Sequence, residues 1–161
     1  MADRGTVFME TTEIPVERTA GEITSLLVKN GARKIRIEYD QAGAPVGVEF
    51  DLQIEGLPLP FRYRLAVQTD ALFKAFQKRR ANPNNRYSGP EYEAKDRAHG
   101  QRTAWRQLFR WLEAQFALVT AGMAKPQQLL LPFVLDATGA QTLFEYFETT
   151  GYKQLGAGGP K

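Results

Sequence analysis

The chain has 161 residues, of which 43% are hydrophobic and 24% are charged, and its formal net charge at neutral pH is +3. This composition is typical of a globular protein, and the length suffices for one domain with a substantial core. No apolar run is long enough to cross a bilayer. A chain without cysteine forms no disulfide and no thiolate metal site, which favours a reducing compartment such as the cytoplasm.

We expect one folded domain between two flexible ends. Residues 1–12 contain no long apolar stretch, so they predict neither a signal peptide nor a tightly packed element. Residues 152–161 are rich in glycine and predict a flexible tail. Residues 13–151 form the predicted single α+β domain.

The domain is predicted to begin with a helix over Val16–Lys29. Apolar residues recur on one face of this segment, and Pro15 suits its first turn. Asn30 and Gly31 supply a left-handed stop, which ends the helix.

Three strands are predicted to follow this helix. Apolar and polar residues alternate over residues 34–39, 46–54 and 57–67, with turn-forming residues between these segments. Alternation with a period of two indicates a strand with one buried face. The three segments therefore predict an antiparallel meander.

The exposed face of the predicted meander carries charges of both signs. In a simple register, Glu49 on the middle strand lies opposite Arg36 and Arg62. Asp51 then lies opposite Lys34. Opposite charges across strands stabilise a sheet modestly, so we interpret these side chains as a neutralised solvent face rather than as a ligand site.

Two helices are predicted after the meander. The first runs from Asp70 to Arg80. The second begins near Pro90, and its helical signal is strongest over residues 101–121. The apolar surface of this second helix is too wide for one stripe, which indicates a central helix covered on several sides, with Gly100 as a weak point.

A fourth strand and a last helix complete the predicted fold. Residues 129–135 predict an edge strand, because Pro132 cannot donate a hydrogen bond to a neighbouring strand. Thr138 is predicted to cap a helix that continues to Thr149. The residues that this helix is predicted to bury are Leu143, Phe144 and Phe147.

Positive charge is concentrated in one third of the chain. Residues 70–115 carry ten lysines and arginines against five acids, whereas the rest of the chain is slightly acidic. Like charges at four-residue spacing on a helix repel each other, and the planar fork of arginine suits phosphate, so the segment indicates an anionic partner. The candidate phosphate-binding residues are Lys78, Arg79, Arg80, Arg86, Arg102, Arg106 and Arg110, and the candidates for stacking on a base are Tyr87 and Tyr92.

These residues also have a structural interpretation, and both interpretations stay open. Cations at the end of a helix, such as Lys78, complement the helix dipole. A charged stripe on a helix is commonly its solvated face, and Glu113 is placed to pair with Arg110. Tyr92 can pack against the domain instead of against a base.

The inventory of residues disfavours catalysis, so we expect no catalytic residue, metal or cofactor. His99 is the single histidine, and it is interpreted as a surface side chain among basic residues. No phosphate-binding loop, dinucleotide fingerprint or nucleophile elbow is present. Asp40 and Asp136 follow predicted strands, where aspartate commonly forms turns.

Five segments of the sequence together carry a family resemblance. They are residues 16–19, 32–40, 104–123, 131–133 and 142–145. They resemble an uncharacterised family of small proteins of phages and prophages, over about residues 13–150. The resemblance implies a phage accessory protein that acts in the cytoplasm of an infected bacterium. It implies core roles for Trp105, Trp111 and Leu118 and a polar group of Arg106, Arg110, Glu113 and Gln115.

Three functional hypotheses follow. The leading one is a non-enzymatic protein that binds nucleic acid through the basic residues 78–110. An alternative is an anti-defence protein that sequesters a small anionic nucleotide, including a cyclic one, or inhibits a host defence protein. A second alternative is a structural assembly protein, for which a homo-oligomer is expected. None of these hypotheses involves a membrane.

Overall fold

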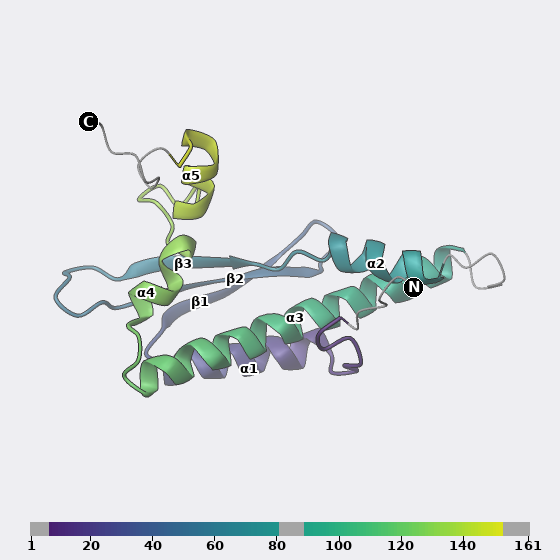
Figure 1. Ribbon diagram of the computed structural model, residues 1–161, viewed down its shortest axis with the longest axis horizontal. Coiled ribbons are helices and arrows are strands. Elements are labelled where there is room, and N and C mark those ends of the chain that lie inside the picture. The colour runs from purple at the N-terminus through teal and green to yellow at the C-terminus, as the bar shows by residue number, and fades with distance from the viewer. Residues whose placement is uncertain (1–6, 81–88, 153–161) are drawn as a thin grey trace.

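The computed structural model describes residues 7–80 and 89–152 of the chain. In chain order its elements are α1 (Val16–Lys29), β1 (Arg33–Tyr39), β2 (Pro45–Leu52), β3 (Phe61–Ala66), α2 (Asp70–Arg80), α3 (Pro90–Thr120), α4 (Pro126–Leu130), the 3-10 helix η1 (Leu131–Phe133) and α5 (Leu143–Thr150). Figure 1 shows two main layers, with α1 and α3 side by side along one face of the sheet. The predicted α+β class is confirmed.

The sheet has the strand order β1-β2-β3 with both pairs antiparallel, so the predicted meander is confirmed. Apolar side chains of the strands pack in one cluster with those of α1 and α3. Core side chains with no exposed surface are Ile23, Leu27, Val48, Phe50, Tyr63, Trp105 and Leu112. The main core therefore lies between the sheet and the two helices.

The other face of the sheet carries ion pairs between the predicted residues. Arg36 is the register partner of Glu49, and Arg36 Nη2 lies 2.5 Å from Glu49 Oε1. The register partner of Arg62 is Asp51 rather than Glu49, but Arg62 Nε lies between both carboxylates, at 3.6 and 3.7 Å. Lys34 Nζ lies 3.5 Å from Asp51 Oδ2. Glu49 and Asp51 are buried beneath these cations, which explains why acids are tolerated there.

α3 is one continuous helix of 31 residues, without a break at Gly100. Gly100 is buried where α2 packs against α3. A Cβ atom added at this position would lie 3.7 Å from Leu72 Cβ and 3.7 Å from Phe73 N. The glycine therefore lies at the contact between the two helices and does not interrupt α3.

The predicted fourth strand over residues 129–135 is wrong. The segment enters α4 and then η1, and proline occupies the first turn of each, at Pro126 and Pro132. Proline is pre-organised for the start of a helix, and its missing N–H is harmless there. What remains of strand pairing with β3 in the described part of the chain is one isolated bridge between Val134 and Tyr63.

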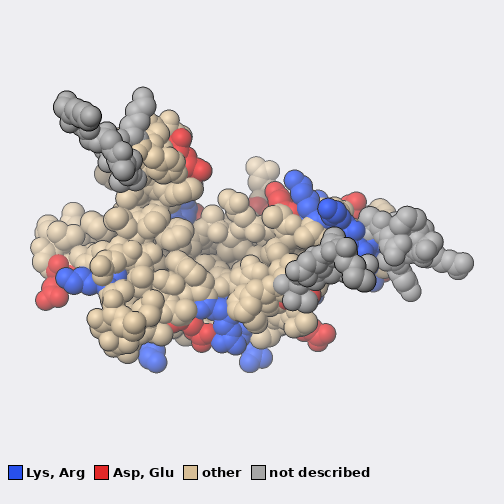
Figure 2. Space-filling view, viewed as in Figure 1, with Lys and Arg blue, Asp and Glu red and all other residues tan. Residues whose placement is uncertain are grey.

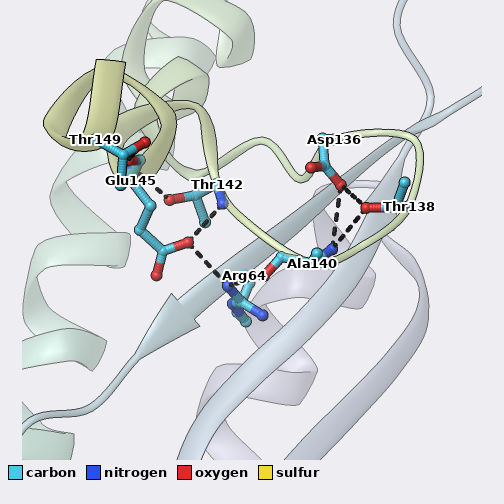
Figure 3. Close-up of polar contacts among 7 residues, drawn as sticks. All are labelled: Arg64, Asp136, Thr138, Ala140, Thr142, Glu145 and Thr149. Carbon is cyan, nitrogen blue, oxygen red and sulfur yellow. Dashed lines mark hydrogen bonds and ion pairs between the residues drawn. The ribbon is translucent and has the colours of Figure 1, made fainter. Parts of the chain in front are cut away.

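α5 begins later than predicted. Its N-cap is Thr142, whose side chain accepts a hydrogen bond from Glu145 N–H, while the Glu145 carboxylate accepts one from Thr142 N–H. Thr138, the predicted cap, instead donates to Asp136 within the preceding turn, at 2.7 Å. The Glu145 carboxylate also accepts a hydrogen bond from Arg64 on β3, at 2.9 Å (Figure 3).

The predicted burial of α5 is also wrong. Phe144 is 48% exposed, and Leu143 and Phe147 are only half-buried. Tyr146 is 46% exposed. α5 stands away from the two main layers in Figure 1 and packs against η1. Its apolar side chains therefore remain partly uncovered by the described part of the chain.

Candidate anion-binding site

One surface cavity gathers basic residues of the predicted set. The end of α2, the first half of α3 and the segment before α1 border this cavity, whose volume is about 400 Å³. Its lining residues are Glu10, Thr11, Phe76, Arg79, Arg80, Asp96 and His99. Two of the seven predicted phosphate-binding residues, Arg79 and Arg80, thus share a concave surface.

Arg80 is held by a carboxylate from the neighbouring helix. Its Nη2 lies 2.5 Å from Asp96 Oδ1, and its Nε donates to Asp96 Oδ2 at 3.1 Å. Asp96 is 3% exposed, so this bidentate pair is largely shielded from water on the carboxylate side. The hydrogen bond to Asp96 raises the pKa of Arg80, which stays charged at all physiological pH values.

Arg79 is held by the segment that precedes α1. Arg79 Nη1 donates to Glu10 Oε2 at 2.5 Å, and Val7 N–H donates to the same carboxylate at 2.9 Å. The hydrogen bond from Arg79 holds the pKa of Glu10 below its ordinary value of 4.5. Residues 7–12 belong to the predicted flexible N-terminus, and the structure places them against this cavity.

His99 contributes to the cavity, which its interpretation as surface filler missed. Its Nε2–H donates to the backbone carbonyl of Glu10. Its ring stacks on Phe76 with a centroid distance of 4.4 Å and an interplanar angle of 9°. His99 therefore links the segment before α1 to both α2 and α3. Its status as the single histidine gave no signal of this contact, which depends on a residue far away in the sequence.

Tyr92, a predicted stacking residue, has cations near its ring. The guanidinium carbon of Arg80 lies 5.1 Å from the ring centroid, and Lys95 Nζ lies 5.3 Å from it. These are cation–π distances. The prediction that Tyr92 stacks on a base is not tested by this arrangement. Arg86 and Tyr87 lie outside the described residues.

The predicted stripe of Arg102, Arg106 and Arg110 does not line the cavity. Arg106 is 7% exposed and forms an ion pair with Glu22 on α1, and this hydrogen bond lowers the pKa of Glu22. Arg110 forms the anticipated pair with Glu113, at 2.7 Å. Arg102 is half-buried, and its Nε has no hydrogen-bond partner among residues 7–80 and 89–152. Of the three arginines, Arg106 therefore joins α3 to α1 through its ion pair with Glu22.

Three cations of α2 and α3 remain exposed without a carboxylate partner in the described ranges: Lys74, Lys78 and Arg97. Lys74 and Lys78 lie one turn apart on α2 and do not line the cavity. Figure 2 shows Lys and Arg side chains in separate groups, one over α2 and another over the middle of α1 and α3, with acidic side chains beside each. The basic residues on this face thus lie in separate groups rather than in one continuous patch.

Other kinds of site find less support in the geometry. Within residues 7–80 and 89–152, no three His, Asp or Glu side chains lie together in a way that could hold a metal ion. In the same ranges, no helix has the length and apolar character required to cross a membrane. Comparison with protein-family models, curated proteins and solved structures found no match for this chain.

Proposed function

We propose that the protein is a non-enzymatic phage accessory protein that binds nucleic acid through the end of α2 and the facing part of α3. The observation that carries this proposal is the cavity in which Arg79, Arg80 and His99 converge. Exposed Lys74 and Lys78 on α2 extend the positive surface beyond it. A phosphate chain is long enough to contact both the cavity and these lysines.

The two arginines of the cavity have different roles in this proposal. Asp96 occupies Nε and Nη2 of Arg80 and so fixes the direction of its remaining N–H groups. Arg79 already donates a hydrogen bond to the carboxylate of Glu10. A carboxylate resembles two oxygens of a phosphate group in its charge and its hydrogen-bonding geometry. A nucleic-acid phosphate therefore binds Arg79 by replacing Glu10. The affinity is expected to be modest without this exchange and to fall steeply with salt.

Binding to short single-stranded DNA, double-stranded DNA and RNA at low and moderate salt tests the proposal. The variant Lys78→Ala is expected to weaken binding and to reduce the slope of log affinity against log salt by about one contact. Lys29→Ala is the matched control, since Lys29 is also exposed but lies at the end of α1 that leads into β1. Absence of binding to all three polymers at low salt, or equal losses in the two variants, contradicts the proposal.

A second candidate is sequestration of a small anionic nucleotide. The cavity volume of about 400 Å³ and the stacked rings of Phe76 and His99 favour it. Thermal-shift measurements with mononucleotides and cyclic nucleotides separate the two candidates. A nucleotide that raises the melting temperature, with no preference for longer chains, supports the small ligand.

A further inference from the structure

β1 is an open edge of the sheet. In the described part of the chain it pairs with β2 on one side and with no strand on the other. Asp40 N–H donates across the hairpin to the Ala44 carbonyl at 2.9 Å. Because backbone groups alternate in direction along an antiparallel strand, those of Ile35, Ile37 and Tyr39 point away from β2. No backbone hydrogen bond to these outward groups occurs among the described residues.

Several side chains of β1 are incompletely covered as well. Glu38 is half-buried, and it has no ion pair within residues 7–80 and 89–152. Tyr39 is 64% exposed. Ile35 and Ile37 pack against the core but are themselves only half-buried. A strand added along this edge would cover the apolar groups and could supply a cation for Glu38.

The sequence of β1 is complementary to itself when it is reversed. On either side of Ile37, each base is mirrored by an acid and each apolar residue by an apolar residue. The residues in chain order are Lys34, Ile35, Arg36, Ile37, Glu38, Tyr39 and Asp40. Two antiparallel copies of this strand, centred on Ile37, therefore set Arg36 of each copy opposite Glu38 of the other. Ile35 of each copy then lies opposite Tyr39 of the other.

Charge selects this register over its neighbours. A register shifted to centre on Arg36 sets two arginines directly opposite each other, and one centred on Glu38 does the same with two carboxylates. Like charges in such positions destabilise a sheet. In the register centred on Ile37, the outward backbone groups hydrogen-bond to one another. Arg36 and Glu38 then form a non-hydrogen-bonded pair, in which opposed side chains are closest.

We infer that two copies of the chain associate through their β1 edges, about a two-fold axis at Ile37. The association joins the two three-stranded sheets into one continuous sheet. Arg36, which already lies 2.5 Å from Glu49 of its own chain, gains Glu38 of the other copy as a second acid. Each copy contributes the same edge, so the contact closes at two copies. α1 leaves this edge open, since it lies along one face of the sheet (Figure 1).

A bulge at Lys34 limits the length of the new pairing. The register of β1 on β2 shifts between Arg33 and Arg36, and Lys34 has a φ of 51°. Such a bulge bends an edge strand and ends its regular pairing, so the new ladder covers residues 35–39. A ladder of this length is expected to give a weak dimer that dissociates on dilution. The dimer does not involve the anion-binding cavity, so it is independent of nucleic-acid binding.

Sedimentation over a range of protein concentrations tests the inference. The wild-type chain is expected to pass from monomer to dimer as its concentration rises. Glu38→Lys sets cations opposite Arg36 at both ends of the pairing, so it is expected to raise the dissociation constant by at least about tenfold. Glu55→Lys is the matched control, because it makes the same change of charge at an exposed residue of the turn after β2. A wild-type chain that is monomeric at every concentration, or equal losses in the two variants, overturns the inference.

Introduced thiols test the register, since the chain has no cysteine of its own. Ile37→Cys places two thiols across the two-fold axis, at a hydrogen-bonded pair whose Cα atoms lie about 5.5 Å apart, which suits a disulfide. This variant is expected to form a covalent dimer with oxidised glutathione. Ile35→Cys is the control, because its thiol lies opposite Tyr39 rather than opposite its own copy. Equal cross-linking of the two variants, or none of Ile37→Cys where sedimentation shows it to be dimeric, overturns the register.

Discussion

Arg80 on α2 and Asp96 on α3 form a bidentate ion pair, with Arg80 Nη2 2.5 Å from Asp96 Oδ1 and Arg80 Nε 3.1 Å from Asp96 Oδ2. The pair fastens the end of α2 to α3, and it borders the candidate anion-binding cavity. Asp96 is 3% exposed, so its replacement removes an ion pair that is shielded from water on the carboxylate side.

The first prediction concerns this pair. Asp96→Ala is expected to lower the free energy of unfolding by about 2 kcal/mol, less than for a fully buried pair because Arg80 retains some contact with water. Glu113→Ala is the control, since it removes the carboxylate of the exposed Arg110–Glu113 pair and is expected to cost about 0.5 kcal/mol or less. Urea unfolding of the two variants measures the difference. Equal costs would show that Asp96 does not clamp α2.

The second prediction concerns Glu10 as a competitor for Arg79. Glu10→Gln removes the negative charge that occupies Arg79, so phosphate polymers are expected to bind the variant more tightly, by about tenfold or less for one released contact. Fluorescence anisotropy with a labelled oligonucleotide at neutral pH measures the change. Glu13→Gln controls for net charge, because it is a nearby change of the same charge at a residue with no ion pair to residues 7–80 or 89–152. Equal gains in both variants contradict a specific role for Glu10.

The contact of Glu10 also depends on pH. Its pKa in the folded protein is lowered, so the contact contributes fully above the ordinary value of 4.5 and is lost as pH falls through the lower folded pKa. The protection of the amides of residues 7–12 against hydrogen exchange, relative to the intrinsic exchange rate at each pH, is therefore expected to fall on acidification below that ordinary value. Glu10→Gln is expected to show fast exchange of these amides already at neutral pH.

The third prediction concerns Tyr63, whose hydroxyl is buried without a hydrogen-bond partner among the described residues. Burial raises the pKa of Tyr63 to about 12. The unfolded chain releases this proton near pH 10, so the folded state loses about 3 kcal/mol of stability as pH rises from there through the folded pKa. Tyr63→Phe is expected to remove this loss and to stabilise the protein by up to about 1 kcal/mol at neutral pH.

Alkaline denaturation curves measure the effect of Tyr63. Tyr39→Phe is the control, because Tyr39 is 64% exposed and its removal should leave the curve unchanged. A Tyr63→Phe curve that falls with pH as steeply as the wild type would show that this hydroxyl finds a partner.

The fourth prediction concerns Gly100 in α3. A Cβ at this position meets Leu72 Cβ at 3.7 Å and Thr69 O at 3.8 Å, which are ordinary van der Waals distances. Gly100→Ala is therefore expected to stabilise the protein by up to about 1 kcal/mol through helix propensity. Gly21→Ala in α1, where no atom lies within 4 Å, measures the propensity gain alone. A loss of stability in Gly100→Ala alone would indicate a tighter contact between α2 and α3.

The sequence predicted those parts of the fold that depend on local patterns. The helix over Val16–Lys29, the helix over Asp70–Arg80 and the meander follow from apolar periodicity and turn residues, and all are present. The fourth strand failed because a short apolar run with Pro132 fits a 3-10 turn as well as a strand. Thr138 and Thr142 are both suitable caps, but Glu145 lies three residues after Thr142, where it completes a capping box and also pairs with Arg64.

The composition of the candidate site was predictable only in part. The cluster of cations at the end of α2 follows from the sequence, because the residues are adjacent. The counter-charges of Arg79, Arg80 and Arg106 come from Glu10, Asp96 and Glu22, respectively. Glu10 and Glu22 lie on segments far from the basic region. Charge counted along the chain cannot reveal such pairs. The same limit hid His99, whose partner is the backbone carbonyl of Glu10.

The outer edge of β3 is paired by Leu135, a residue that is synthesised much later than the strand itself. Arg62 offers its carbonyl to Leu135, and the intervening chain forms α2, α3 and α4. During synthesis from the N-terminus, the meander therefore leaves the ribosome with this edge open. An open edge is a template for pairing with other chains. The yield of folded protein is then expected to depend on how soon η1 and the segment after it pack against β3. The last third of the chain thereby protects the sheet in the first part of the chain from aggregation.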